Sequence, residues 1–329
     1  IGVAGAMAAA AVVEAAGGDP RQGVDAAAIS LQNTMGSPCD PVAGACEIPC
    51  HTRNAVAASS AFTCADLILG GYANPIPLDE AVDEMMGRYE VMVRSVAAGL
   101  DDGQSDMLLL QPTATAVFEA ENRGALAIGG IHARAAARAM AVMHHCNSRG
   151  VVCAAPTGGS AGTVPGVVVS LAEQMELSQR QIALALFAAS AIGLIVAKRA
   201  TFAAEIAGCQ VEIGVAGAMA AAAVVEAAGG SAGQAADAAA ISLQNTMGSP
   251  CDPVAGACEI PCHTRNAVAA SSAFTCADLI LGGYANPIPL DESIDASYEV
   301  GRALPDELRC TARGGCAVTP SALAIPLKR

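Results

Sequence analysis

Three cysteines, each in a loop between alanine-rich segments, are the residues of this sequence best suited to metal chemistry. Cys209 follows Ala-Gly, Cys251 precedes Asp-Pro-Val, and Cys262 follows Ile-Pro. Cysteines on breaks between helices can direct their sulfur atoms to one point, as a metal ion or an iron–sulfur cluster requires. Because free cysteine is also among the most buried residue types, each thiol taken alone is more simply a structural one. For the set of three, we favour ligation.

Polar side chains near these cysteines are candidates for proton transfer and for binding a carboxylate. Glu205 lies four residues before the first cysteine, and His263, Arg265 and Asn266 directly follow the third. An arginine can pair bidentately with a carboxylate, and a histidine can move a proton near neutral pH. The alternative is that Glu205 caps a turn and that the other three form a solvated polar turn.

A loop of small residues at positions 156–163, Pro-Thr-Gly-Gly-Ser-Ala-Gly-Thr, precedes an apolar segment. Consecutive small residues expose backbone N–H groups, and the start of a helix adds positive potential, which suits a carboxylate or a phosphate. The loop lacks the Gly-Lys-Ser/Thr of a P-loop, and a tight turn between helices is the alternative. The substrate-binding candidates are Thr157, Gly158, Gly159, Ser160 and Gly162.

The elements that must position these residues are predicted to be helices, because no alternating strand pattern is sustained. We expect helices over residues 3–16, 25–35, 54–69, 78–99, 133–146, 164–175 and 178–200, and a loop with a short helix over 101–130. The prediction is an all-α fold, a compact helical domain with small residues at the helix contacts and with cluster-binding loops.

One long segment occurs twice. The sequence of residues 1–80 is repeated at residues 213–292, and the two copies differ at five positions within residues 19–24. Solenoids instead repeat short, diverged units several times. The first copy contains Cys39 and Cys50 but no counterpart of Cys209. We therefore divide the chain into a partial duplicate, residues 1–80, and a main domain, residues 81–329.

Composition narrows the classes of function. The net charge of −14 disfavours nucleic acid as a partner. The 13 cysteines, an odd number, do not resemble a secreted disulfide scaffold, so a reducing compartment, the cytoplasm, is predicted. Only two lysines occur, Lys198 and Lys328, which disfavours a pyridoxal-phosphate enzyme because its cofactor needs a lysine Schiff base.

A membrane location is not expected. The longest uncharged apolar run, residues 182–197, is shorter than the roughly 20 residues that a membrane-spanning helix needs. A buried core helix is the better interpretation, and no signal peptide is recognisable at the first residues.

Several motifs together resemble the α subunit, or α domain, of the iron–sulfur-dependent L-serine dehydratases. They are the Ala-Pro-Thr-x-Gly-Ser-x-Gly loop at 155–162, Gly-Cys-Gln at 208–210 followed by Glu-Ile-Gly, Cys-Asp-Pro-Val-x-Gly from Cys251, and Pro-Cys-x-x-Arg-Asn-Ala around Cys262. Residues 82–329 resemble one nearly complete α unit, and residues 1–80 resemble the later half of a second unit.

The resemblance implies a carbon–oxygen lyase of amino-acid degradation and gluconeogenesis. Cys209, Cys251 and Cys262 would hold a [4Fe-4S] cluster whose fourth iron acts as a Lewis acid on the substrate hydroxyl. L-Serine would lose water and yield pyruvate and ammonia. The β domain of the family is missing from this sequence, so a separate β subunit is expected, and an oligomer is expected as well.

Two rival functions and one rival arrangement remain open. In the first, the duplication abolishes turnover and the chain is an inactive relative of the enzyme. In the second, the chain is a helical membrane protein whose helices pack against one another through small residues. Residues 1–80 could also displace 213–292 and bring Cys39 and Cys50 to Cys209. We favour the C-terminal copy because Cys209 is continuous with it.

Overall fold

The computed structural model describes residues 2–32, 50–71, 78–101 and 105–328. These residues form helices joined by turns and loops, and no strand occurs among them. One isolated bridge pairs Cys251 with Arg309. The predicted all-α fold class is confirmed.

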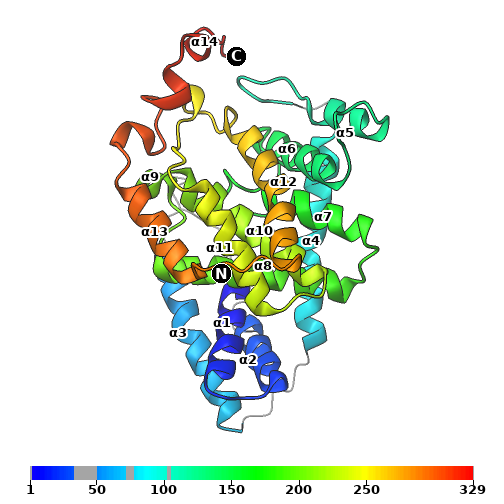
Figure 1. Ribbon diagram of the computed structural model, residues 1–329, viewed down its shortest axis with the longest axis vertical. Coiled ribbons are helices and arrows are strands. Elements are labelled where there is room, and N and C mark those ends of the chain that lie inside the picture. The colour runs from blue at the N-terminus through cyan, green and yellow to red at the C-terminus, as the bar shows by residue number, and fades with distance from the viewer. Residues whose placement is uncertain (1, 33–49, 72–77, 102–104, 329) are drawn as a thin grey trace.

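The centre of the molecule is α10 (Ile213–Ala227), whose residues are buried from Ile213 to Val225. Its sequence is almost entirely alanine, glycine and valine, so it has no polar face to keep in water. Four helices enclose it (Figure 1): α7 (Thr163–Gln174), α8 (Gln179–Arg199), α11 (Ala232–Thr246) and α12 (Cys262–Leu281).

The remaining elements of the main body pack outside this core. They are α4 (Leu78–Gly99), α5 (Ala114–Asn122), α6 (Ile131–Asn147), α9 (Ala204–Ala207), α13 (Leu290–Arg302) and α14 (Pro320–Leu323), with 3-10 turns η2 (Cys209–Val211), η3 (Val254–Gly256), η4 (Asp306–Leu308) and η5 (Gly315–Val318). The helices expected over 78–99, 133–146, 164–175 and 178–200 are found as α4, α6, α7 and α8, and no end is shifted by more than two residues.

Small residues let the helices approach closely, as predicted. A Cβ atom added at Gly166 of α7 would lie 2.6 Å from the carbonyl oxygen of Ala135 in α6. Close packing of this kind leaves no space for a larger side chain.

The N-terminal copy forms a separate lobe of three helices, α1 (Gly2–Ala15), α2 (Pro20–Gln32) and α3 (Cys50–Leu69), at the bottom of Figure 1. The lobe has its own hydrophobic cluster, which includes Val13, Ile29 and Ile68. Leu194 of α8 belongs to the same cluster and connects the lobe to the main body. Helix α2 begins five residues before the expected 25–35 helix, and residues 33–35 lie outside the described part of the chain.

Two helical segments are apolar and long enough to cross a membrane. The first, Gln179–Arg199, is 50% buried in the protein, and the second, Cys209–Ala227, is 89% buried. Core helices of globular proteins meet the same criteria, and α10 is enclosed by neighbouring helices. The apolar run at 182–197, expected as a core helix, lies within α8.

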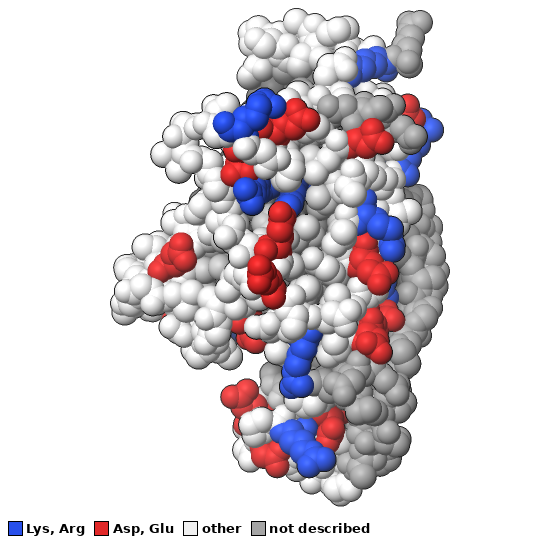
Figure 2. All heavy atoms as spheres, turned by 90° about the vertical axis from the view of Figure 1, so that its right-hand side faces the viewer, with Lys and Arg blue, Asp and Glu red and all other residues white. Residues whose placement is uncertain are grey.

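The face shown in Figure 2 carries basic and acidic side chains in small groups of mixed sign. No continuous basic stripe is visible among the described residues on this face. A surface of this kind offers no row of contacts to the phosphates of a nucleic acid.

Candidate metal centre and active site

The Gly-Cys-Gln motif positions Cys209 through its two neighbours. Gly208 has a φ of 72°, and a Cβ atom there would lie 2.7 Å from the carbonyl oxygen of Ser249. Glycine is therefore required at this close approach. The buried Gln210 donates to the Ala207 carbonyl (2.9 Å) and accepts from the Gly248 amide (2.7 Å). Its amide thus connects the segment before Cys209 to the loop that carries Cys251.

Cys251 is held by the segment after α13. Its amide donates to the Leu308 carbonyl (2.8 Å), and its carbonyl accepts from the Cys310 amide (2.7 Å). These bonds give the backbone N–H and carbonyl groups of this buried residue hydrogen-bond partners, and its thiol can contact other side chains.

The thiols of Cys209 and Cys251 and a carboxylate oxygen of Glu212 lie within 4.8 Å of one another, close enough to hold a metal ion. Hydrogen bonds with Cys209 and then Cys310, together with burial, raise the pKa of the Cys251 thiol. The physical reason is that these hydrogen bonds and the removal from water favour the protonated thiol, and repulsion between neighbouring thiolates adds a smaller contribution. Two of the three predicted metal ligands therefore converge, each provided by a different loop.

Cys262, the third predicted ligand, begins α12 and lies beside Cys258. A hydrogen bond with Cys262, followed by burial, raises the pKa of the Cys258 thiol, and Glu212 and Cys146 add smaller contributions. Glu212 therefore lies close to the thiols of Cys209 and Cys251 and near that of Cys258.

The glycine-rich loop covers Glu212. Thr157 donates a short hydrogen bond to Oε1 of Glu212. A Cβ atom at Gly159 would lie 2.5 Å from that same oxygen and 3.3 Å from the Cys258 sulfur, so a larger residue there would displace the Glu212 carboxylate. Burial raises the pKa of Glu212, and the Thr157 hydrogen bond opposes this shift. The loop thus contacts the metal-binding candidates through its small residues.

The other loop candidates have structural contacts. Ser160 is buried, and its hydroxyl oxygen lies 3.0 Å from that of Thr157. The Gly162 amide donates to Oδ1 of Asn266 (3.1 Å), and the Gly158 carbonyl accepts a weak bond from the thiol of Cys146 (3.8 Å). These contacts hold the loop in shape.

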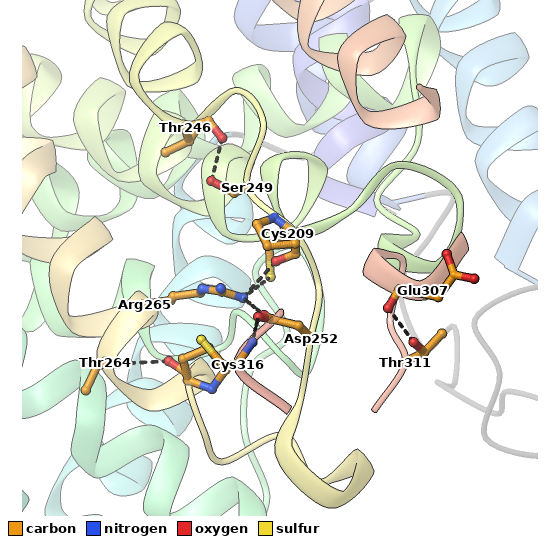
Figure 3. Close-up of polar contacts among 11 residues, drawn as sticks. Cys209, Thr246, Ser249, Asp252, Thr264, Arg265, Glu307, Thr311 and Cys316 are labelled. Carbon is orange, nitrogen blue, oxygen red and sulfur yellow. Dashed lines mark hydrogen bonds and ion pairs between the residues drawn. The ribbon is translucent and has the colours of Figure 1, made fainter. Parts of the chain in front are cut away.

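The guanidinium of Arg265 points toward Cys209 and toward the buried Asp252, as Figure 3 shows. Its Nη1 is 3.7 Å from the Cys209 sulfur, 2.8 Å from Oδ1 of Asp252 and 2.7 Å from the Pro250 carbonyl. Asp252 in turn accepts from the Cys316 amide (2.6 Å). The guanidinium thus brings a fixed positive charge to the thiols.

Asn266, the residue after Arg265, fastens α12 to the glycine-rich loop. Its Oδ1 accepts from the amides of Gly162 and Thr163, both at 3.1 Å. Its Nδ2 donates to the Gly159 carbonyl (2.8 Å) and the Cys262 carbonyl (2.9 Å). A buried amide with all these partners positions its neighbours, so this geometry favours a positioning role.

A cavity of about 320 Å³ opens beside Cys209 and Arg265. Hydroxyl and amide side chains of α11 and the loop after it form part of its wall, namely Ser242, Asn245, Thr246 and Ser249. The cavity is large enough for a small amino acid, and it combines one cation with several hydrogen-bonding groups.

The structure separates His263 from this cavity. Its side chain is 1% exposed, and its ring centroid lies 5.1 Å from that of His144. Burial, with a smaller contribution from His144, lowers the pKa of His263 to about 3. The imidazole is therefore neutral near pH 7, and its burial argues against the predicted role in proton transfer.

Glu205 is exposed at α9 and forms a hydrogen bond with the Cys310 side chain. Glu212 is one of the three residues whose ligand atoms lie together with those of Cys209 and Cys251, and Glu205 is not among them. The prediction that Glu205 transfers a proton near the thiols stays a prediction.

Comparison with known proteins identifies the family. The family model described as serine dehydratase alpha chain matches residues 1–88 and 79–317. A probable L-serine dehydratase alpha chain of Bacillus subtilis is 40% identical over 243 residues, which cover 74% of this chain and 81% of the relative. The chain belongs to the serine dehydratase alpha-chain family. This agrees with the resemblance drawn from the motifs.

Other relatives have the same family name. A probable L-serine dehydratase alpha chain of Latilactobacillus sakei is 45% identical over 181 residues, covering 55% of this chain and 87% of the relative. L-Serine dehydratase TdcG of Escherichia coli is 39% identical over 182 residues, which cover 40% of that longer protein. Enzymes with this name are carbon–oxygen lyases, the class that was predicted.

Sequence reasoning missed three residues that border this site: Glu212, Asp252 and Cys258. Glu212 and Asp252 stood inside quoted motifs, next to the predicted ligands, and a search for acids beside each cysteine would have found them. The backbone of Cys310 is next to Cys251 because its amide donates to the Cys251 carbonyl.

Proposed function

We propose that this chain dehydrates L-serine to pyruvate and ammonia, with a [4Fe-4S] cluster held by Cys209, Cys251 and Cys262. The observation that carries the proposal is the convergence of the Cys209 and Cys251 thiols beside a cavity lined by Arg265. Family membership supports the reaction, since relatives are named L-serine dehydratase.

The residues present fit such a cluster in donor chemistry. Thiolates are the usual ligands of iron–sulfur clusters, and Cys209, Cys251 and Cys262 are all buried. When bound, the cluster would supply a Lewis-acidic iron for the hydroxyl leaving group of the substrate.

The substrate carboxylate is proposed to bind Arg265 and the glycine-rich loop. Asp252 and the Pro250 carbonyl orient the guanidinium, so little conformational entropy remains to be lost when a ligand binds. Asn266 fixes the loop against α12, so that the amides of the loop keep their positions.

We assign removal of the α-proton to Glu212, in place of the predicted Glu205 or His263. Its carboxylate lies among the thiols and is oriented by Thr157. A carboxylate that is partly removed from water and held by one donor is a stronger base than an exposed one. The aminoacrylate that forms can tautomerise and hydrolyse without further catalysis.

In this proposal the main domain, residues 81–329, is the catalytic unit, and residues 1–80 are a duplicate without a cluster of their own. A separate β subunit, an oligomeric state and a cytoplasmic location complete the proposal.

The test is to reconstitute the chain without oxygen, measure iron and acid-labile sulfide, and assay pyruvate formation from L-serine. About four irons and four sulfides per chain with turnover are expected. In Glu212→Gln, the iron and sulfide should remain while the turnover falls about 10²-fold or more. Iron and sulfide near zero after reconstitution would overturn the cluster assignment, and full activity of Glu212→Gln would overturn the assignment of the base.

A further inference from the structure

Glu259 is a buried acid that the proposed reaction does not use. The residue is 2% exposed, and its two carboxylate oxygens accept three consecutive backbone amides, those of Leu108 (2.5 Å), Leu109 (2.9 Å) and Leu110 (2.8 Å). Burying a carboxylate costs free energy unless hydrogen-bond donors replace the water that it loses. The three amides supply these donors and form an amide cradle that one carboxylate fills.

The segment that provides the amide cradle is itself held in place. The Lys328 amide donates to the Leu108 carbonyl (2.9 Å), and the Lys328 ammonium donates to the Leu110 carbonyl. Two residues before Leu108, the Asp106 amide donates to the hydroxyl oxygen of Ser148 (3.1 Å), at the end of α6. A carboxylate in the cradle is therefore bound to a fixed anchor.

The backbone of Glu259 belongs to the turn that leads into Cys262. The Glu259 carbonyl accepts from the His263 amide (3.0 Å), which closes the first turn of α12 around Cys262. Arg265 follows Cys262 by three residues and so lies on the same face of α12, and its Nη1 is 3.7 Å from the Cys209 sulfur. This face of α12 is therefore directed toward Cys209, and the path of the turn sets where the Cys262 thiol lies.

We propose that Glu259 is a positioning residue for Cys262. Its carboxylate, bound in the amide cradle of residues 108–110, holds the turn so that the Cys262 thiol is directed toward Cys209 and Cys251 before a cluster binds. A ligand that is already in place loses less conformational entropy on binding. The inference rests on the proposed function in one respect, namely that Cys262 is a cluster ligand.

The turn also has backbone contacts that do not involve this carboxylate. Nδ2 of Asn147 donates to the Cys258 carbonyl (3.0 Å), and the Val254 amide donates to the Ile260 carbonyl (2.9 Å). Removal of the carboxylate should therefore loosen the turn without unfolding it. The expected effect is local, with the Cys262 thiol more accessible and the other two proposed ligand thiols unchanged.

The first measurement uses the full chain, reduced and free of metal, so that it does not depend on a cluster. The rate of alkylation by iodoacetamide is measured for each thiol by tandem mass spectrometry. Trypsin cuts after Arg21 in the first copy and after Arg199 ahead of the second, so Cys50 and Cys262 fall on peptides of different mass.

Glu259→Ala should raise the alkylation rate of Cys262 relative to that of Cys209 by about tenfold, and amide hydrogen exchange over residues 108–110 should accelerate by a similar factor. Glu259→Gln keeps one oxygen acceptor in the amide cradle and should give intermediate rates. Glu47→Ala, at the equivalent position of the first copy and outside the described residues, is the matched control and should behave like the parent.

A double-mutant cycle separates positioning from general stabilisation. After reconstitution without oxygen, the iron content should fall about threefold in Glu259→Ala and about tenfold in Cys262→Ser. The double variant should retain as much iron as Cys262→Ser alone, because both changes act through one ligand.

Two results would overturn the proposal: alkylation of Cys262 at the parent's rate in Glu259→Ala, or losses of iron that multiply in the double variant. A parent chain that takes up no iron would contradict the proposed function instead. In that case the alkylation and hydrogen-exchange rates of the metal-free chain would still decide whether Glu259 positions Cys262.

Discussion

The two copies of the repeated segment place the same residue in different surroundings. Phe62 of α3 is 52% exposed, whereas its counterpart Phe274 of α12 is 4% exposed. Phe274 packs edge-to-face against His132 of α6, with ring centroids 5.2 Å apart. The ammonium of Lys198 lies over the Phe62 ring, 5.1 Å from its centroid. The difference lies in the neighbours, since the helices themselves have the same sequence.

The first helices of the copies differ in the same way. In α10, Ala223 is fully buried, because four helices surround it. In α1, the equivalent Ala11 is exposed, and the helix contacts α2, α3 and α8. Apolar composition permits burial, but a partner on each face is needed to achieve it.

Local features, by contrast, are conserved between the copies. Asp19 and Gln22 exchange backbone-to-side-chain hydrogen bonds of 2.9 Å at the start of α2. Ser231 and Gln234 form the equivalent capping box at the start of α11. One of the five differences between the copies therefore replaces one good N-cap with another.

The largest predicted difference concerns the metal. Cys251→Ser should lower the iron content after reconstitution by on the order of tenfold, because it removes one of the proposed cluster ligands. Cys39→Ser, at the equivalent position of the first copy and outside the described residues, should keep the iron content of the parent. Iron and sulfide analysis of the two variants shows which copy supplies the ligand. Loss of iron in Cys39→Ser alone would mean that the first copy supplies the ligand.

A smaller difference is predicted for the two phenylalanines. Phe274→Ala should lower the free energy of unfolding by about 3–5 kcal/mol, because it opens a cavity between α12 and α6. Phe62→Ala should cost less than about 1 kcal/mol, the strength of an exposed cation–π contact. Chemical denaturation of both variants gives the comparison, and equal losses would show that α3 is buried by a partner in solution.

The smallest difference is predicted for the caps. Asp19→Ala and Ser231→Ala should each destabilise the first turn of their helix by about 1 kcal/mol, because each removes the same hydrogen bond. Amide hydrogen exchange resolves α2 and α11 separately and is the suitable measurement. A cap that matters in one copy only would contradict the view that these helix starts are locally determined.

The sequence alone determined the helices and the motif loops. The predicted helix over 78–99 agrees with α4 in both ends, since its amphipathic pattern and flanking breaks act within a few residues. The predicted cysteines Cys209 and Cys251 meet, because each lies in a loop next to a helix that must be buried.

Only the tertiary structure decided which other side chains lie beside Cys209 and Cys251. Cys310 reaches Cys251 through a backbone pairing across 58 intervening residues, and Glu212 receives Thr157 from a loop 55 positions earlier. His263 follows a predicted ligand yet turns into the core beside His144, away from the cavity. Helical periodicity and capping operate over a few residues, whereas packing selects among many partners at once, so the sequence specifies the segments and the fold selects their contacts.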